Sequence, residues 1–144
     1  MSAAEKEVHR VIGSYKAAVL ARDVEAFMRL YHPTVRVFDA WGVWTYEGAP
    51  AWRIAVEGWF ASLASEKVRV TFSELQTTSE HAVTFVTAIV TYAAESAQGQ
   101  SLRSTQNRIT WVLRETGHVL RIAHEHTSVP IGFEDSKAIL VRDQ

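Results

Sequence analysis

The side chains best suited to chemistry lie near the end of the chain, where His124 and His126 flank Glu125. On a β-strand these two histidines point to the same face, because successive side chains alternate between faces. Such a pair can bind a metal ion, transfer protons, or form hydrogen bonds in a pocket wall. A metal ion would need a third ligand, which no cluster of His, Asp or Glu supplies by its spacing, and Asp39 could supply one only through the fold. We therefore expect no metal, and we interpret both histidines as pocket-wall residues, with His124 also a candidate acid or base.

The histidines belong to a predicted β-hairpin between Asn107 and Pro130, in which apolar and polar residues alternate on both sides of Thr116-Gly117. With that pair as the loop, the predicted cross-strand pairs are Leu113 with Leu120, Trp111 with Ile122, Ile109 with His124, and Asn107 with His126. These side chains share one face, and the opposite face carries Arg108 across from Glu125. A shift of one residue would exchange the two faces.

The face that carries the histidines has the composition of a ligand cavity, because it combines large apolar side chains with a few polar groups. Aromatic residues from the middle of the chain are expected to complete the cavity. The predicted cavity residues are Trp41, Trp59, Phe60, Asn107, Ile109, Trp111, Ile122 and His126.

Three helices are predicted in the first half of the chain. Ser2 and Glu5 form a capping-box pattern, and apolar residues at helical spacing carry the first helix to about Arg22. Asp23 can cap a second, shorter helix, which Pro33 would end. The sequence Gly48-Ala49-Pro50 marks the start of a third helix, because proline is tolerated in the first turn.

Strand patterns occupy most of the remaining chain. A strand is predicted over Thr34–Ala40, and alternating or continuously apolar segments fill residues 67 to 129, with a bulge near Leu75 and a turn around Gly99. Helices followed by a meander of long antiparallel strands predict an α+β fold, in which the helices pack on one face of the sheet. No linker or repeat divides residues 1–144, so we expect a single domain.

Composition limits the classes of partner. The chain has 144 residues, 47% of them hydrophobic, which is enough for one sizeable core. A formal net charge of −1 without a basic cluster argues against nucleic acid and anionic membranes as partners. The absence of cysteine excludes disulfides and thiolate chemistry, and the N-terminal residues contain no apolar signal segment. We expect a cytoplasmic protein whose partner is a neutral small molecule or another protein, and we expect no cofactor.

The end of the chain resembles a known family. The stretch R-I-T-W-V-L-R-E-T-G-H-V-L-R-I-A-H-E-H-T-S-V-P is similar to the closing signature of SnoaL-like domains, within the nuclear transport factor 2-like (ketosteroid isomerase-like) superfamily. The association domain of calcium/calmodulin-dependent kinase II ends in a similar His-x-His-x-Ser pattern. Positions that match the signature are Arg108, Thr110, His124, Glu125, His126, Ser128 and Pro130, whereas Leu120 replaces its usual Trp. The resemblance covers nearly the whole chain and implies a cone-shaped fold, with three N-terminal helices on a curved antiparallel sheet that has a mixed edge.

The same resemblance implies two catalytic residues. Aligned without a gap to ketosteroid isomerase, the chain has Tyr15 at the position of the oxyanion-hole tyrosine and Asp39 at that of the catalytic base. A carboxylate in an apolar cavity can take a proton from carbon next to a carbonyl, while a phenol donates to the developing oxyanion. Alternatively, Tyr15 is a packing residue, and Asp39 accepts hydrogen bonds from local backbone amides or pairs with an arginine such as Arg36 or Arg53.

One position departs from the isomerase. The second oxyanion donor of that enzyme would fall at Ile109, which can donate no hydrogen bond. Steroid isomerase activity is therefore not expected, although His124 or Asn107 could replace the donor. Two functions remain open: a small-molecule-binding protein, as an isomerase, cyclase or hydrolase that needs no cofactor, and a non-catalytic association module.

The superfamily usually dimerises through its convex sheet face, and the resemblance implies a homodimer here. That face mixes small, β-branched and charged residues, which suits a protein interface. The residues predicted to form it are Arg108, Thr110, Val112, Arg121 and Glu125.

Overall fold

The computed structural model describes residues 1–142. Within them the chain forms helices α1 (Ala3–Ala21), α2 (Val24–Met28) and α3 (Ala49–Ser62), and strands β1 (Tyr31–Phe38), β2 (Tyr46–Glu47), β3 (Lys67–Glu80), β4 (Val83–Glu95), β5 (Ser101–Thr116) and β6 (Val119–Ser128). The predicted α+β class is confirmed. The helices are not all N-terminal to the sheet, because β1 and β2 precede α3.

The ends of the helices follow from local sequence. The Ser2 hydroxyl accepts a hydrogen bond from the Glu5 amide at 3.1 Å, and the Glu5 carboxylate accepts one from the Ser2 amide at 3.3 Å. Asp23 caps α2 by accepting from the Ala26 amide at 3.0 Å. Both predicted caps are confirmed, but α2 ends at Met28, so that Pro33 lies inside β1 instead of ending the helix.

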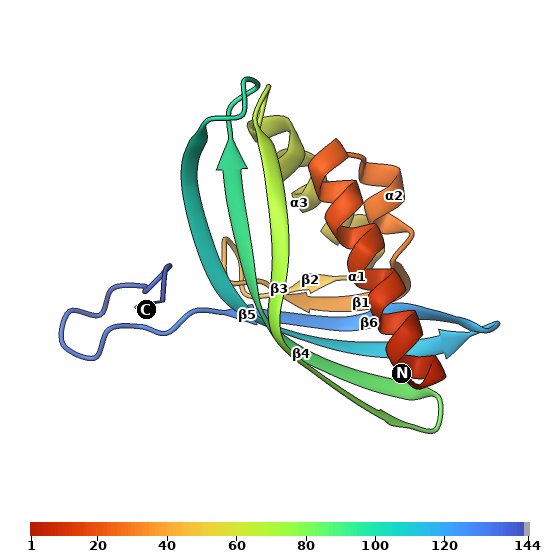
Figure 1. The fold of residues 1–144 in the computed structure, drawn as a ribbon. Helices are drawn as coiled ribbons and strands as arrows, with labels where there is room; N and C mark the ends of the chain where they lie inside the picture. Colours follow the sequence, from red (N-terminus) through yellow and green to blue (C-terminus); the bar gives the residue numbers. More distant parts are fainter. Residues whose placement is uncertain (143–144) are drawn as a thin grey trace.

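The strands form one curved, mixed sheet in the order β2-β1-β6-β5-β4-β3. Neighbouring strands are antiparallel except β1 and β6, which are parallel. The register of β3 shifts between Ser73 and Gln76, which confirms the predicted bulge near Leu75. Bulges bend a strand and increase its twist. Figure 1 shows the long strands β3, β4 and β5 bending around the helices, which all cover the concave face.

The loop of the β5–β6 hairpin differs from the prediction. Its two loop residues are Gly117 and His118, with φ angles of 58° and 68°, and Thr116 pairs with Val119. Positive φ at both positions is typical of a tight type I′ turn. The pairing near the turn therefore moves by two residues, so that Leu113 faces Ile122 and the apolar side chains still point to the core.

A second shift, at Val112 and Leu113 of β5, exchanges the faces of β6. One extra residue of β6, at Ala123, is accommodated there as a bulge. Because side chains alternate, every residue after the bulge points the opposite way from the predicted register. That register is therefore wrong over this part of the hairpin, where the pairs are Val112 with His124, Trp111 with Glu125, Thr110 with His126, Ile109 with Thr127, and Arg108 with Ser128.

The core lies between the helices and the concave face of the sheet. Its largest fully buried side chains are Trp111, Phe27, Ile109, Leu113 and Ile122. Aromatic rings pack edge-on or tilted around Phe27, whose ring centre lies 5.0 Å from that of Tyr15 and 5.6 Å from that of Phe60. Such contacts add to the free energy gained by burying the rings. The packing fixes α1, α2 and α3 relative to the sheet.

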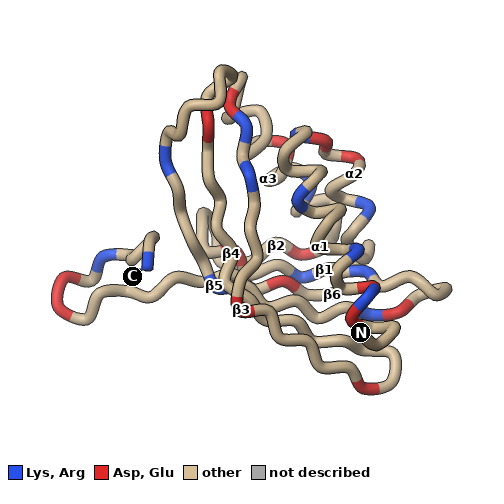
Figure 2. Tube along the Cα trace, viewed as in Figure 1, with Lys and Arg blue, Asp and Glu red and all other residues tan. Residues whose placement is uncertain are grey.

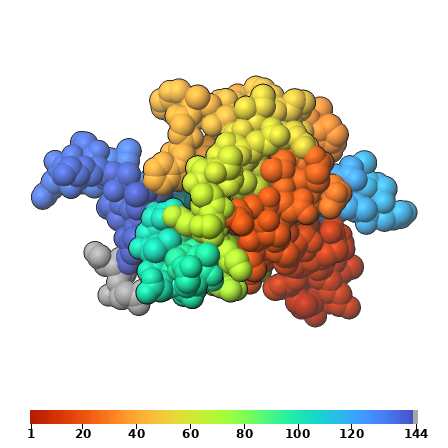
Figure 3. Space-filling model, turned by 90° about the horizontal axis from the view of Figure 1, so that it is seen from above, coloured from red at the N-terminus to blue at the C-terminus, as the bar shows by residue number. Residues whose placement is uncertain are grey.

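After β6 the chain extends away from the body and folds back. The Ile139 amide donates to the Pro130 carbonyl oxygen, and the Gln106 amide of β5 donates to that of Leu140. Figure 3 shows this C-terminal segment and the β5–β6 turn at opposite ends of the molecule. Charged residues of both signs are spread along the fold (Figure 2). None of the helices in residues 1–142 combines the length and the apolar character that a membrane crossing requires.

Candidate functional site

A cavity of about 540 Å³ lies between α3 and the concave face of the sheet. Its wall is mostly aromatic and aliphatic, with a few polar side chains, as is usual for sites that bind small molecules. The residues that line it are Tyr15, Asp39, Trp41, Gly42, Tyr46, Trp52, Ala55, Val56, Trp59, Leu63, Val68, Tyr92, Ala94, Arg103, Thr105, Asn107, Glu125 and Thr127. They come from α1, α3, strands β2 to β6 and the loop after β1, so the whole fold positions them.

The structure brings only some of the predicted site residues together. Those on the cavity wall are Tyr15, Asp39, Trp41, Trp59 and Asn107. Those that lie in the core behind the wall are Phe60, Ile109, Trp111 and Ile122. His124 and His126 lie neither on the cavity wall nor in the core, because the bulge in β6 turns them to the outer face of the sheet. Glu125 and Thr127 take the inward positions instead.

Asp39 follows the end of β1 and lines the cavity. Its carboxylate accepts a hydrogen bond of 2.8 Å from the Thr127 hydroxyl, which itself accepts from the Ala40 amide at 2.8 Å. Burial raises the pKa of Asp39 above its ordinary value, and hydrogen bonds from Thr127 and from the Trp41 and Ala40 amides offset part of that rise. A carboxylate destabilised by burial is a stronger base than an exposed one.

No arginine within residues 1–142 neutralises Asp39. The two candidates, Arg36 and Arg53, pair with Glu47 and with the Glu25 and Glu57 carboxylates respectively. The structural role proposed for Asp39 as the partner of either arginine is therefore wrong. Its contacts with local backbone amides are present, but they do not bring its pKa down to the ordinary value.

Two tyrosines form a hydrogen-bonded pair on the cavity wall. The hydroxyls of Tyr15 on α1 and Tyr92 on β4 are 2.8 Å apart, and either can donate. Burial raises the pKa of both phenols, so both stay protonated at neutral pH. With two hydroxyl protons and one shared hydrogen bond, the pair retains one proton for a further acceptor. A ligand oxygen in the cavity would be such an acceptor.

Glu125 on β6 is a buried carboxyl at the same cavity. Its Oε1 atom accepts hydrogen bonds from the Tyr31 hydroxyl at 2.6 Å and from Nε1 of Trp111 at 2.9 Å. Burial raises the pKa of Glu125 to about 7, although these two bonds lower it and the nearby Asp39 raises it further. No ion pair with Glu125 forms within residues 1–142.

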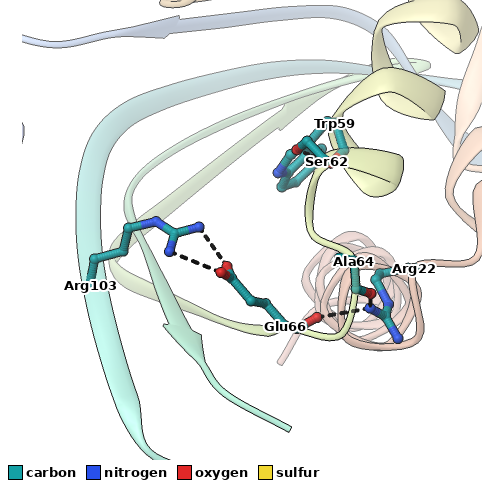
Figure 4. A network of polar contacts seen from close by, with 6 residues as sticks. All are labelled: Arg22, Trp59, Ser62, Ala64, Glu66 and Arg103. Carbon is teal, nitrogen blue, oxygen red and sulfur yellow. Dashed lines mark hydrogen bonds and ion pairs between the residues drawn. The ribbon is translucent and has the colours of Figure 1, made fainter.

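Arg103 is the cationic residue of the cavity lining, and its charge is neutralised by an ion pair with Glu66. It binds the Glu66 carboxylate at 2.6 Å, and Arg22 donates to the Glu66 carbonyl oxygen at 3.0 Å and to that of Ala64. Figure 4 shows this network joining β5 to the loop between α3 and β3. Because Arg103 is already paired, the cavity offers no free positive charge among the residues described. It therefore suits a neutral ligand better than an anion.

The histidines and Phe38 form a cluster on the outer face of the sheet. Nδ1 of His124 lies 2.6 Å from the Arg36 carbonyl oxygen, and His126 is exposed. Both imidazoles pack edge-on against the Phe38 ring. The centre of that ring lies 5.1 Å from the His124 ring centre and 5.4 Å from the His126 ring centre. Within residues 1–142 no three metal-ligating side chains come together. The cluster is a polar and aromatic surface patch.

Sequence reasoning missed Glu125, Thr127, Tyr92, Tyr46 and Trp52 as cavity residues. For Tyr92 the reason is that β4 is apolar on both faces, so no pattern separates the cavity side from the outer side. For Glu125 the reason is the bulge at Ala123, which no turn residue or glycine marks. The sequence offered one signal for Trp52. It belongs to the same series of aromatic residues in α3 from which Trp59 was predicted to line the cavity.

Several solved structures have a fold similar to that of this chain. An NTF2-like protein of unknown function from Pseudomonas putida KT2440 has a TM-score of 0.86 at 20% identity, and the match covers 100% of this chain and 99% of that one. The protein Aln2 from a Streptomyces species has a TM-score of 0.79 at 14% identity, covering 89% and 91% of the two chains. At these identities the likeness concerns the fold alone.

A third similar structure is a putative calcium/calmodulin-dependent protein kinase II association domain from Xanthomonas campestris. Its TM-score is 0.72 at 15% identity, with 85% of this chain and 84% of that one covered. No match was found among curated proteins. The sequence profile of the SnoaL-like domain matches residues 8–132, which is most of the chain. This chain therefore belongs to the SnoaL-like domain family.

Proposed function

We propose that the protein binds a neutral small molecule with a carbonyl group and moves a proton at the carbon next to that carbonyl, without a cofactor. One observation carries this proposal: a largely apolar cavity of about 540 Å³ contains Asp39, a carboxylate with a raised pKa and no cationic partner among the described residues. Such a group is suited to general base catalysis. Many isomerase and cyclase reactions of carbonyl compounds begin with this step.

The tyrosine pair supports the same proposal. When a proton leaves the carbon, negative charge develops on the carbonyl oxygen, and a donor already in place stabilises that charge. Tyr15 and Tyr92 share one hydrogen bond of 2.8 Å and keep one hydroxyl proton for such an oxygen. Asp39 and the tyrosines line one cavity, so a ligand of suitable size would meet both.

The test uses prodan, a neutral fluorescent naphthyl ketone whose emission reports its surroundings. We expect the wild-type protein to bind prodan and to accelerate the uptake of solvent deuterium at the carbon next to the carbonyl. Ala55→Trp should remove both effects, because Ala55 lines the cavity and an indole would occupy the space of the ligand. Fluorescence titration measures the binding, and mass spectrometry measures the deuterium.

Ile54→Trp is the matched control, because Ile54 is the preceding residue of α3 and is 71% exposed. This variant should behave as the wild type does. Prodan that binds but takes up deuterium no faster than in buffer would contradict the catalytic part of the proposal. Equal binding by the Ala55 and Ile54 variants would contradict the cavity as the binding site.

We further propose that the chain forms a homodimer through the outer face of the sheet. Phe85 is 47% exposed there and pairs with Val112, next to the cluster of His124, His126 and Phe38. Exposed aromatic side chains with a polar surround are typical of protein interfaces. Glu125, which the sequence assigned to this face, points to the cavity instead, so the interface is built from the other four predicted residues and the histidines.

A cytoplasmic location stays a prediction.

The dimer is expected to separate when a charge is placed on this face. Phe85→Asp should give a monomer in sedimentation velocity at micromolar concentration, because a carboxylate would be buried without a partner. Ile54→Asp, at an exposed apolar position on α3, should leave the dimer intact. A monomeric wild-type protein would contradict the proposed interface.

A further inference from the structure

The residue that the function proposed above leaves unused is Glu125. It is only 2% exposed, yet it lines the cavity and lies opposite Trp111 across the β5–β6 ladder. A buried carboxylate without a cationic partner is costly, and the usual result is that the group holds its proton. The protonation state of Glu125 and its position at the cavity therefore have to be explained.

The two carboxyl oxygens of Glu125 have different surroundings. Oε1 accepts both hydrogen bonds, from Tyr31 and from Trp111, whereas Oε2 accepts none from residues 1–142. Among the side chains of residues 1–142, the fully enclosed atoms that lack a partner are Nε1 of Trp52 and Oδ1 of Asn107. Since Oε2 also lacks a partner but is not fully enclosed, it is open to the cavity that Glu125 lines.

This asymmetry decides where a proton would sit. The two accepted hydrogen bonds occupy both lone pairs of Oε1, so the proton of a neutral Glu125 lies on the other oxygen, Oε2. A neutral Glu125 is then held in place by two donors and presents an O–H group to the cavity. An ionised Glu125 would present only an acceptor there.

We propose that Glu125 is a second acid–base residue of the cavity, whose O–H group binds the carbonyl oxygen of a neutral ligand and gives it a proton. This role rests on the proposed function, in which Asp39 is the base. The C–H bond next to the carbonyl breaks, its proton goes to Asp39, and its electron pair forms a carbon–carbon double bond. The π bond of the carbonyl breaks, and its electron pair moves onto the carbonyl oxygen, which takes the Glu125 proton to give an enol. The reverse transfers restore both residues and the carbonyl.

The groups around Glu125 are consistent with a neutral carboxyl near pH 7. The titratable side chains that face it are Tyr15 from α1, Tyr31 from β1, Asp39 after β1, and Tyr92 from β4. None of them carries positive charge, and Arg103 is paired with Glu66. Burial raises the pKa of Glu125 to about 7. Acid catalysis is most efficient when the pKa lies near the working pH.

The first test needs no ligand. Glu125→Gln preserves the local hydrogen bonds, because the amide oxygen can accept from Tyr31 and Trp111 while the NH₂ group faces the cavity. Infrared difference spectra of the wild type minus this variant should contain the C=O band of a protonated carboxyl at pH 6. The band should disappear as the pH rises through about 7. Its absence at pH 6 would overturn the proposal.

The second test compares prodan with a dimethylaminonaphthalene that has no carbonyl group. Wild-type affinity for prodan should fall as Glu125 ionises above about pH 7, and the loss should reach about 10-fold, the size expected of one hydrogen bond to a neutral acceptor. Glu125→Gln should bind prodan with no such pH dependence. Affinity that rises with pH, or an equal dependence for the probe without the carbonyl, would overturn the proposal.

The two tests separate the possible failures. A cavity that binds neither probe would contradict the proposed function, while the infrared titration would still decide whether Glu125 holds a proton. An infrared band without any pH dependence of prodan binding would leave the cavity as a ligand site but remove Glu125 from contact with the ligand oxygen.

Discussion

Asp39→Asn is expected to lower the rate of deuterium uptake into bound prodan by about 100- to 10,000-fold, the usual contribution of a general base. The amide has the shape of the carboxylate and can still accept the Thr127 hydrogen bond, but it cannot take a proton. Affinity for prodan should change by less than about tenfold, or about 1.4 kcal/mol. Mass spectrometry of the recovered ketone measures the rate, and fluorescence measures the affinity.

Asp23→Asn is the matched control, because it makes the same chemical change outside the cavity. Asp23 caps α2, and asparagine caps a helix about as well as aspartate. This variant should exchange deuterium at the wild-type rate. If uptake survives in Asp39→Asn, Asp39 is not the base, and a binding or association role becomes the better account of the cavity.

Glu125→Gln is expected to stabilise the fold by about 3 kcal/mol near pH 8 and to have little effect near pH 4.5. The reason is the rise in the pKa of Glu125 from 4.5 to about 7, at about 1.4 kcal/mol per unit. Below pH 4.5 both the folded and the unfolded chain hold the proton, so folding meets no penalty. Between pH 4.5 and about 7 the unfolded chain ionises first, and the free energy of unfolding falls as the pH rises. Glutamine does not titrate and avoids this loss.

Urea unfolding of the wild type and the variant across this pH range measures the difference. Titrating groups that do not interact with Glu125 are present in both proteins and cancel in the comparison. Glu80→Gln, at the exposed end of β3, should follow the wild type at every pH. A Glu125→Gln variant that is less stable than the wild type near pH 8 would mean that Glu125 is ionised and stabilised in the folded protein.

The sequence predicted the elements of this fold because local chemistry determines them. The capping box of Ser2 and Glu5, the cap at Asp23 and the bulge near Leu75 all occur where the pattern indicated. The parallel pairing of β1 with β6 had no local signal, because it joins segments about 90 residues apart. Such pairing depends on tertiary packing.

The candidate site was predicted less well, and a single residue explains most of the difference. Ala123 forms a bulge that turns His124 and His126 outward and Glu125 inward. All three side chains are polar, so alternation of apolar and polar residues cannot reveal the change of phase. Tyr15 and Asp39 were proposed from the family resemblance, and both line the cavity, but their roles in catalysis stay predictions.

A crystal structure of the protein with bound prodan would reveal the orientation of the ketone, and the proposed proton transfer requires one particular orientation. We expect the carbon next to the carbonyl to lie within about 3.5 Å of an Asp39 carboxyl oxygen, the distance at which a proton can be transferred. The carbonyl oxygen should accept hydrogen bonds from Glu125 or from the Tyr15 and Tyr92 pair. Prodan bound outside the cavity, or with its carbonyl turned away from all three residues, would contradict the account.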